Sequence, residues 1–205
     1  MRDRSLVLLP LALVALAAMS AVSLFLGVAD TNNDVVAISR IPRTIAILLS
    51  GATIAVAGLL MQLLSRNRFV EPSTVGTTEA AALGLLLVTL AFPESPIWVK
   101  MVCASVAALI GTALFLTAVR KIPNPGSFTV PLIGIMLGGV IGAVATFLAY
   151  QYDLLQSLGA WQLGSYAGVL RGRYELLWLI GILVILAYIA ADRFTILGLG
   201  HNYAV

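Results

Sequence analysis

Six long apolar stretches, separated by short polar segments, dominate the chain. A helix needs roughly 20 apolar residues to cross the hydrocarbon region, and in lipid it must satisfy its own backbone hydrogen bonds. We therefore predict an all-α, polytopic transmembrane helical bundle, with residues 1–205 forming a single transmembrane domain. The predicted spans are Ser5–Leu26, Ile41–Leu64, Thr74–Phe92, Ile97–Val119, Phe128–Tyr150 and Glu175–Ala191.

The first stretch has two interpretations, because Arg2 and Arg4 precede it as they would precede the core of a signal peptide. Such a core is usually about 7–15 residues long, which is shorter than this stretch. Its length favours a retained span.

Composition supports membrane insertion and argues against nucleic-acid binding. Hydrophobic residues make up 60% of the chain and charged residues 10%, whereas a soluble domain is about half apolar and about a quarter charged. The net charge of +3 is shared among loops on both sides and forms no basic run.

The distribution of basic residues predicts a cytoplasmic N-terminus. In that orientation seven Lys and Arg residues lie inside and five outside, a weak split in the direction of the positive-inside rule. The outer set contains the pairs Arg40/Arg43 and Arg171/Arg173, which need a separate reason to be there. The longest outer connection, about Gln151–Tyr174, is predicted to contain a short interfacial helix.

Small residues form stripes on two of the predicted spans. Gly134, Gly138 and Gly142 recur every four residues, and Gly51, Ala55 and Gly58 do something similar. Such a stripe lets a second backbone approach closely. Ordinary bundle packing explains it more simply than a dimer or pore-lining face, but spacing alone does not decide between them.

Few side chains could carry chemistry. Cys103 and His201 are single residues of their type and cannot build a metal site, and no phosphate-binding G-x-x-x-x-G-K-[ST] loop is present. Glu79 is the only ionisable residue well inside a span, where a carboxylate is a candidate functional site. Thr77, Thr78 and water could instead satisfy it in a structural role. Without the clustered polar residues of a membrane enzyme, we predict a transporter and not an enzyme.

Several ordered motifs then suggest a family. The chain resembles the permease subunits of bacterial ABC importers for iron–siderophore complexes, haem and vitamin B12, from Arg40 onward. The motifs that carry the resemblance are RIPRT at 40–44, MQLLSRN at 61–67, EPSTVG at 71–76, AALG at 81–84 and WQLGS at 161–165.

The resemblance implies an architecture larger than this chain. Family members have about ten spans in two related halves and pair, as homodimers or heterodimers, into a two-subunit pore in the cytoplasmic membrane. The end of the sequence resembles the start of the loop that docks onto the cytoplasmic ATPase dimer, with Gly198, Gly200, His201 and Ala204 in its pattern. His201 stands where an acidic residue is common. We expect this sequence to be the N-terminal portion of such a permease, with ATP and Mg²⁺ on the partner ATPase and no cofactor of its own.

The resemblance also explains the outer arginines. It implies that Arg40 and Arg43 meet acidic residues of an extracytoplasmic substrate-binding protein, since guanidinium groups pair with carboxylates in a fixed, bidentate geometry. Arg171 and Arg173 are candidates for a second outer contact. Interfacial snorkelling is the alternative for both pairs. A bulky cargo also needs a wide path lined by small residues such as Gly51, Ala52 and Ala55.

The cargo is predicted from three short segments that resemble the branch serving catecholate-type ferric siderophores, although vitamin B12 or haem would fit the same argument. These segments are Thr77–Ala80, Asp153–Gln156 and Gly172–Leu177. Two other functions remain open. An ion-coupled secondary transporter would use Glu79 as its relay, and a membrane scaffold would transport nothing.

Overall fold

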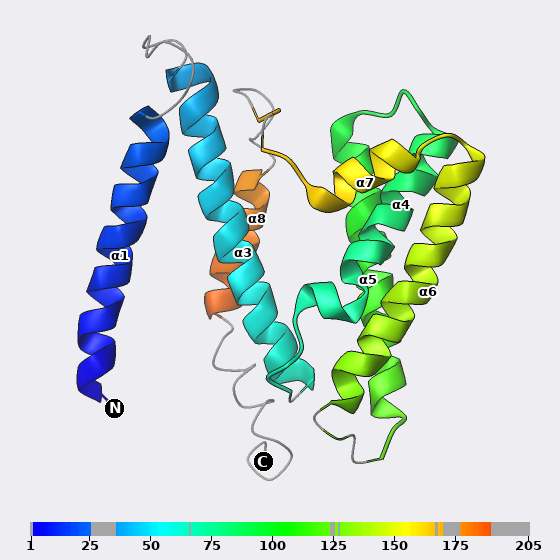
Figure 1. Ribbon diagram of the computed structural model, residues 1–205, viewed down its shortest axis with the longest axis horizontal. Coiled ribbons are helices and arrows are strands. Elements are labelled where there is room, and N and C mark those ends of the chain that lie inside the picture. The colour runs from blue at the N-terminus through cyan, green and yellow to red at the C-terminus, as the bar shows by residue number, and fades with distance from the viewer. Residues whose placement is uncertain are drawn as a thin grey trace. The chain divides into compact units, whose positions relative to one another are not determined.

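A computed structural model describes residues 2–25, 36–65, 67–123, 126, 128–166, 168–169 and 177–189. These ranges contain helices and turns and no strand, so the all-α prediction is confirmed for them (Figure 1). The elements are α1 (Arg2–Phe25), the π-helical turn η1 (Val36–Arg40), α3 (Ile41–Ser65), the 3-10 turn η2 (Pro72–Val75), α4 (Thr77–Ala91), α5 (Ile97–Arg120), α6 (Thr129–Gln151), α7 (Leu155–Leu163) and α8 (Leu177–Ile189).

Each predicted span corresponds to one helix, with one informative difference in the third. That helix begins at Thr77 and not at Thr74, because Pro72 starts a separate 3-10 turn and Gly76 has a left-handed backbone with φ 81°. The predicted short helix after Gln151 is also present, as α7.

Three described helices are long and apolar enough to cross a membrane by length and composition. They are Val36–Ser65, Ile97–Arg120 and Thr129–Gln151, with mean hydropathies of 2.2, 2.2 and 2.3. Shorter apolar helices cover Pro10–Phe25, Thr77–Ala91 and Leu177–Ala187. At about 1.5 Å per residue, the 15 residues of α4 reach about 22 Å, less than the hydrocarbon thickness of about 30 Å.

The chain divides into two compact units, the first made of residues 1–51 and 166–181 and the second of residues 52–165 and 182–205. In the first unit, the hydroxyl groups of Ser23 and Thr44 lie 3.3 Å apart and join α1 to α3. A Cβ added at Gly181 of α8 would lie 3.4 Å from Leu49 of α3.

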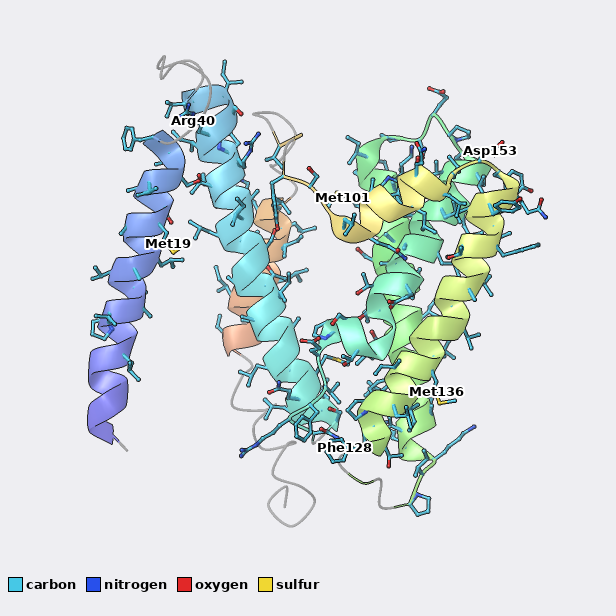
Figure 2. The ribbon with its side chains drawn as sticks, in the orientation of Figure 1. Met19, Arg40, Met101, Phe128, Met136 and Asp153 are labelled. Atoms are coloured by element: carbon cyan, nitrogen blue, oxygen red, sulfur yellow. The ribbon has the colours of Figure 1, made fainter. Side chains whose placement is uncertain are left out.

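In the second unit α4 packs against α5, α6, η2 and α7 (Figure 1). This unit contains two buried apolar clusters, and the second includes residues of α4. One contains Met61, Val70, Val75, Phe115 and Val130, and the other contains Ala82, Leu86, Ala145, Ala149 and Leu158. Phe128, labelled in Figure 2, stacks on Phe69 with ring centroids 5.6 Å apart and ties the start of α6 to the segment before η2.

Candidate functional site

The connection from α3 to α4, residues 67–76, contains no α-helix, only turns and the 3-10 turn η2, and we call it the elbow. The side chain of Asn67 is buried and accepts a 2.9 Å hydrogen bond from the backbone N–H of Phe69. Val70 is fully buried beside it. Non-helical backbone inside a membrane protein is tolerated where protein covers it or where it lines a cavity.

The second half of the elbow satisfies its own polar groups. The Glu71 backbone N–H donates to Thr74 Oγ1 at 3.0 Å, and the Ser73 hydroxyl donates to Glu71 Oε1 at 2.7 Å. The Thr77 hydroxyl donates to the carbonyl of Pro72. These local bonds stabilise a turn in place of a continued helix.

The glycine stripe of α6 packs against this elbow. A Cβ at Gly134 would collide with the carbonyl oxygen of Thr74, and a Cβ at Gly138 would lie 3.2 Å from the Cα of Gly76. A Cβ at Gly76 would in turn lie 3.0 Å from the Gly138 backbone. The missing side chains therefore allow two backbones of the same chain to approach closely.

A second pair of glycines performs the same role between α4 and α5. A Cβ at Gly84 would collide with that of Ala107, and one at Gly111 would lie 2.6 Å from the Cβ of Ala80. Gly111 belongs to neither of the small-residue stripes that the sequence analysis identified. A single glycine in an apolar helix was its only signal.

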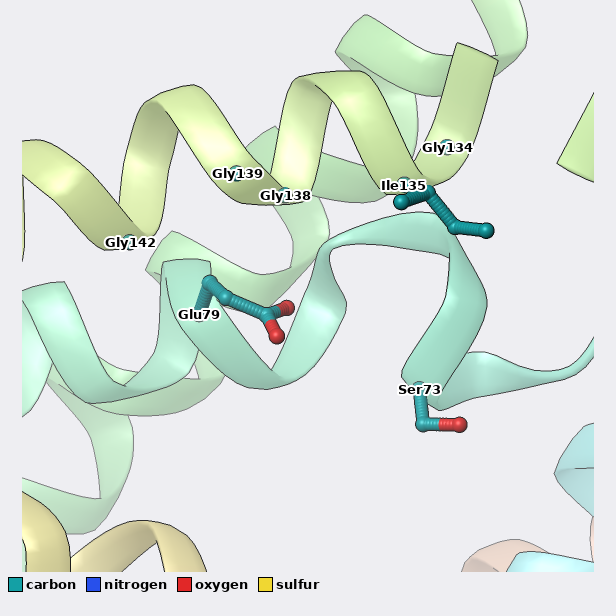
Figure 3. Close-up of a pocket in the computed structure, with 7 residues that line it drawn as sticks. All are labelled: Ser73, Glu79, Gly134, Ile135, Gly138, Gly139 and Gly142. Atoms are coloured by element: carbon teal, nitrogen blue, oxygen red, sulfur yellow. The ribbon is translucent and has the colours of Figure 1, made fainter. Parts of the chain in front are cut away.

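A cavity of about 330 Å³ lies between the start of α4 and the glycine stripe. Its lining contains Glu79, the intramembrane acid predicted from sequence, together with Ser73, Gly134, Ile135, Gly138, Gly139 and Gly142 (Figure 3). The sequence singled out Glu79 and three of these glycines separately, and the fold brings them together. Ile135 was missed, because one aliphatic residue in an apolar helix carries no signal.

The Glu79 carboxylate lies against the glycines of α6. A Cβ at Gly138 would lie 3.4 Å from Glu79 Oε2, and a Cβ at Gly142 would lie 3.5 Å from Glu79 Cγ. Oε2 is buried and has no hydrogen-bond partner among the described residues. The Thr77 hydroxyl, one of the groups predicted to satisfy Glu79, donates instead to the carbonyl of Pro72.

Glu79 lies in the first turn of α4, and this position offsets part of the free-energy cost of burying Oε2 without a hydrogen-bond partner. A carboxylate near a helix N-terminus gains about 0.3–1 kcal/mol from the helix dipole. A buried charged group without a partner costs more than the roughly 1–3 kcal/mol of a neutral one. Among the described residues, none donates a hydrogen bond to Oε2.

Both predicted docking arginines are partly buried and engaged within the chain. Arg40 Nη1 donates a 2.9 Å hydrogen bond to the carbonyl of Leu24, near the end of α1. Arg43 also has an interaction, although its Nε is buried without a hydrogen-bond partner. Arg40 thus has a structural role whether or not it meets a partner protein.

The stripe on α3 differs from that on α6. Gly51, Ala52 and Ala55 are exposed in the described part of the chain, and nothing lies within 4 Å of a Cβ position at Gly51. Gly58 is half-buried, with Pro72 3.9 Å from its Cβ position.

Several predicted residues fall outside the described ranges. These are Arg171 and Arg173, and the residues of the predicted ATPase-coupling loop, Gly198, Gly200, His201 and Ala204. Within the described ranges, no three His, Cys, Asp or Glu side chains gather as metal ligands would.

Two curated relatives have similar sequences. The petrobactin import system permease protein FatD of Bacillus anthracis is 43% identical over 199 residues, which is 95% of this chain and 60% of the relative. The petrobactin import system permease protein YclN of Bacillus subtilis (strain 168) is 44% identical over 167 residues, or 82% of this chain and 53% of the relative. The chain thus spans little more than half the length of these relatives.

A solved structure has the same fold. It is described as an inward-facing conformation of a metal-chelate type ABC transporter, and it aligns with a TM-score of 0.71 at 25% identity. The alignment covers 95% of this chain and 65% of that one. The model of the FecCD transport family matches residues 5–205, and the chain belongs to that family.

Proposed function

We propose that this chain forms part of the permease subunit of an ATP-driven importer, which carries a ferric siderophore across the bacterial cytoplasmic membrane. The observation that carries this proposal is the 43% identity over 199 residues to a permease named for petrobactin import. The catecholate branch predicted from the sequence is the cargo class that we propose. The permease binds and releases cargo and contributes no covalent chemistry.

In the proposed assembly this permease subunit has three kinds of partner. A second permease subunit completes the pore, a cytoplasmic ATPase dimer drives it, and an extracytoplasmic binding protein delivers the loaded siderophore. The N-terminus is cytoplasmic in this arrangement. Family membership supports these partners, because the family is one of transport proteins.

Reconstitution tests the central claim. The intact permease is placed in proteoliposomes with its co-purifying ATPase and a binding protein, and uptake of radiolabelled ferric siderophore is measured with and without internal ATP. We expect uptake that requires ATP and persists when an uncoupler collapses the ion gradient. Uptake that is abolished by the uncoupler while ATP is held constant would support the ion-coupled alternative.

We also propose that Arg40 and Arg43 orient the binding protein on the outer surface. Removing a close charge pair typically costs about 2–5 kcal/mol of binding free energy when the pair is desolvated. Arg43→Glu should therefore weaken binding-protein affinity by about 30-fold or more, measured on nanodiscs by surface plasmon resonance. Both arginines also have interactions within the chain, so the unfolding temperature of the variant is compared with that of the native protein.

Arg120→Glu is the matched control, because Arg120 is exposed at the opposite end of a predicted span from the outer loops. It should leave affinity unchanged. Equal affinity of the Arg43→Glu variant and the native protein would refute the docking role.

A further inference from the structure

The cavity beside Glu79 opens to the surface of the described residues, because Ser73, Ile135 and Gly139 on its lining are exposed. Four of its seven lining residues are glycines, and a Cβ at Gly139 would have no atom within 4 Å. At roughly 30 Å³ per water in the liquid, about 330 Å³ could hold a small organic group and not only a single ion.

The polar groups on the lining are hydrogen-bond acceptors. Glu79 offers carboxylate oxygens, one of them buried without a partner. The Ser73 hydroxyl already donates its proton to Glu71 Oε1. The other lining side chains are apolar or absent, and none of them is Lys, Arg or His. An occupant that complements an ionised Glu79 carboxylate donates hydrogen bonds and carries positive charge.

The same lining argues against a metal cation. Calcium takes about six to eight oxygen ligands and magnesium demands near-octahedral coordination, whereas a single carboxylate lines this cavity. An ammonium group needs up to three acceptors, and its alkyl carbons can lie against the glycine backbone and Ile135. An alkylammonium group suits one carboxylate with apolar walls better than a bare ion does.

We propose that the Glu79 cavity binds a positively charged alkylammonium group, whose N–H groups donate to the Glu79 carboxylate. The group is either a free small amine or an amine carried by the cargo. This inference goes beyond the proposed function, because the site could bind an amine in a permease with any cargo.

The test uses the intact permease in lipid nanodiscs, with methylammonium chloride replacing sodium chloride at constant ionic strength. Unfolding temperature is followed by tryptophan fluorescence. At about five times the dissociation constant, binding to the native state should raise this temperature by about 2–4 °C. Potassium chloride in place of methylammonium chloride should cause no rise.

Two carboxylate variants separate the site from general charge effects. Glu79→Gln keeps the side chain's shape but removes its charge and should abolish the rise. Glu94→Gln removes an exposed carboxylate in the turn after α4, and this variant should still show the rise in unfolding temperature. The absence of a rise in the native protein, or an equal rise in Glu79→Gln, would overturn the proposal.

A third variant tests the cavity without touching the acid. Gly139→Val adds carbon atoms where a Cβ meets open space, so the fold should persist while the cavity becomes smaller. Binding should weaken by about tenfold or more. Unchanged binding in Gly139→Val would contradict the assignment to this cavity, even if Glu79→Gln failed to fold.

Siderophore uptake, measured with and without methylammonium, distinguishes an amine carried by the cargo from a free amine. It also tests the proposed transport function independently of amine binding. If the amine belongs to the cargo, methylammonium should inhibit uptake, and if a free amine is bound, uptake should continue. Binding without any siderophore uptake would refute the proposed function alone. ATP-driven uptake without methylammonium binding would refute this inference alone.

Discussion

The small-residue stripes of α3 and α6 have nearly the same sequence pattern but different surroundings. Gly134, Gly138 and Gly142 of α6 face the elbow and Glu79 of their own chain. Gly51 of α3 has no neighbour within 4 Å of its Cβ position in the described part of the chain. A stripe that packs against its own chain stabilises the fold, whereas the stripe on α3 is exposed among the described residues.

The core beside the filled stripe should be the most sensitive region. Phe115 is fully buried among residues of α3, α6 and the elbow, so Phe115→Ala should lower the free energy of unfolding by about 3–5 kcal/mol through the cavity it leaves. Leu114, on the same helix and 50% exposed, is the control, and its alanine variant should cost far less. Denaturant unfolding in detergent measures both. Equal losses would mean that the buried cluster does not hold the elbow.

Gly76 tests the close approach of the elbow to α6. Gly76→Ala should destabilise the protein by about 2–4 kcal/mol, because its φ of 81° costs roughly 1–2 kcal/mol for an L-residue and its Cβ meets the Gly138 backbone. Thermal unfolding measures the effect. Gly58→Ala is the control, since its nearest neighbour lies at an ordinary contact distance of 3.9 Å. It should be neutral or stabilising, as alanine favours helix.

Two glycines of α6 allow a comparison within one helix. Gly134→Ala should cost about 1–3 kcal/mol of unfolding free energy, because its Cβ collides with the backbone carbonyl of Thr74. Gly139→Ala adds the same atom in open space and should cost nothing. The two variants differ only in what the new methyl group meets. A Gly134→Ala protein as stable as Gly139→Ala would show that the stripe is not filled as described.

The open stripe should give the smallest effect on stability. Gly51→Leu should change the free energy of unfolding by no more than about 0.5 kcal/mol, as expected for an exposed site. If α3 faces a second subunit or the transport path, the same variant should still reduce siderophore uptake. Normal uptake would place this stripe against lipid.

Much of the fold followed from local pattern, whereas the candidate site followed only in part. The apolar runs predicted the helices, because backbone satisfaction in lipid leaves few alternatives to a helix. Glu79 was identifiable as an acid in an apolar stretch, but its neighbours Ser73 and Ile135 were not. Ser73 approaches Glu79 because a 3-10 turn from Pro72 and the left-handed Gly76 precede α4, and Ile135 lies on the helix that packs against this turn.

The sequence by itself determined where the helices lie to within a few residues and which faces carry small residues. Only the tertiary structure decided which small-residue face is filled, that Glu79 borders a cavity and that Arg40 bonds to the end of α1. The physical reason is that the spacing of small residues shows which of them share one side of a helix. A glycine on that side permits any neighbouring segment to approach. The neighbour is selected by packing between segments far apart in the chain.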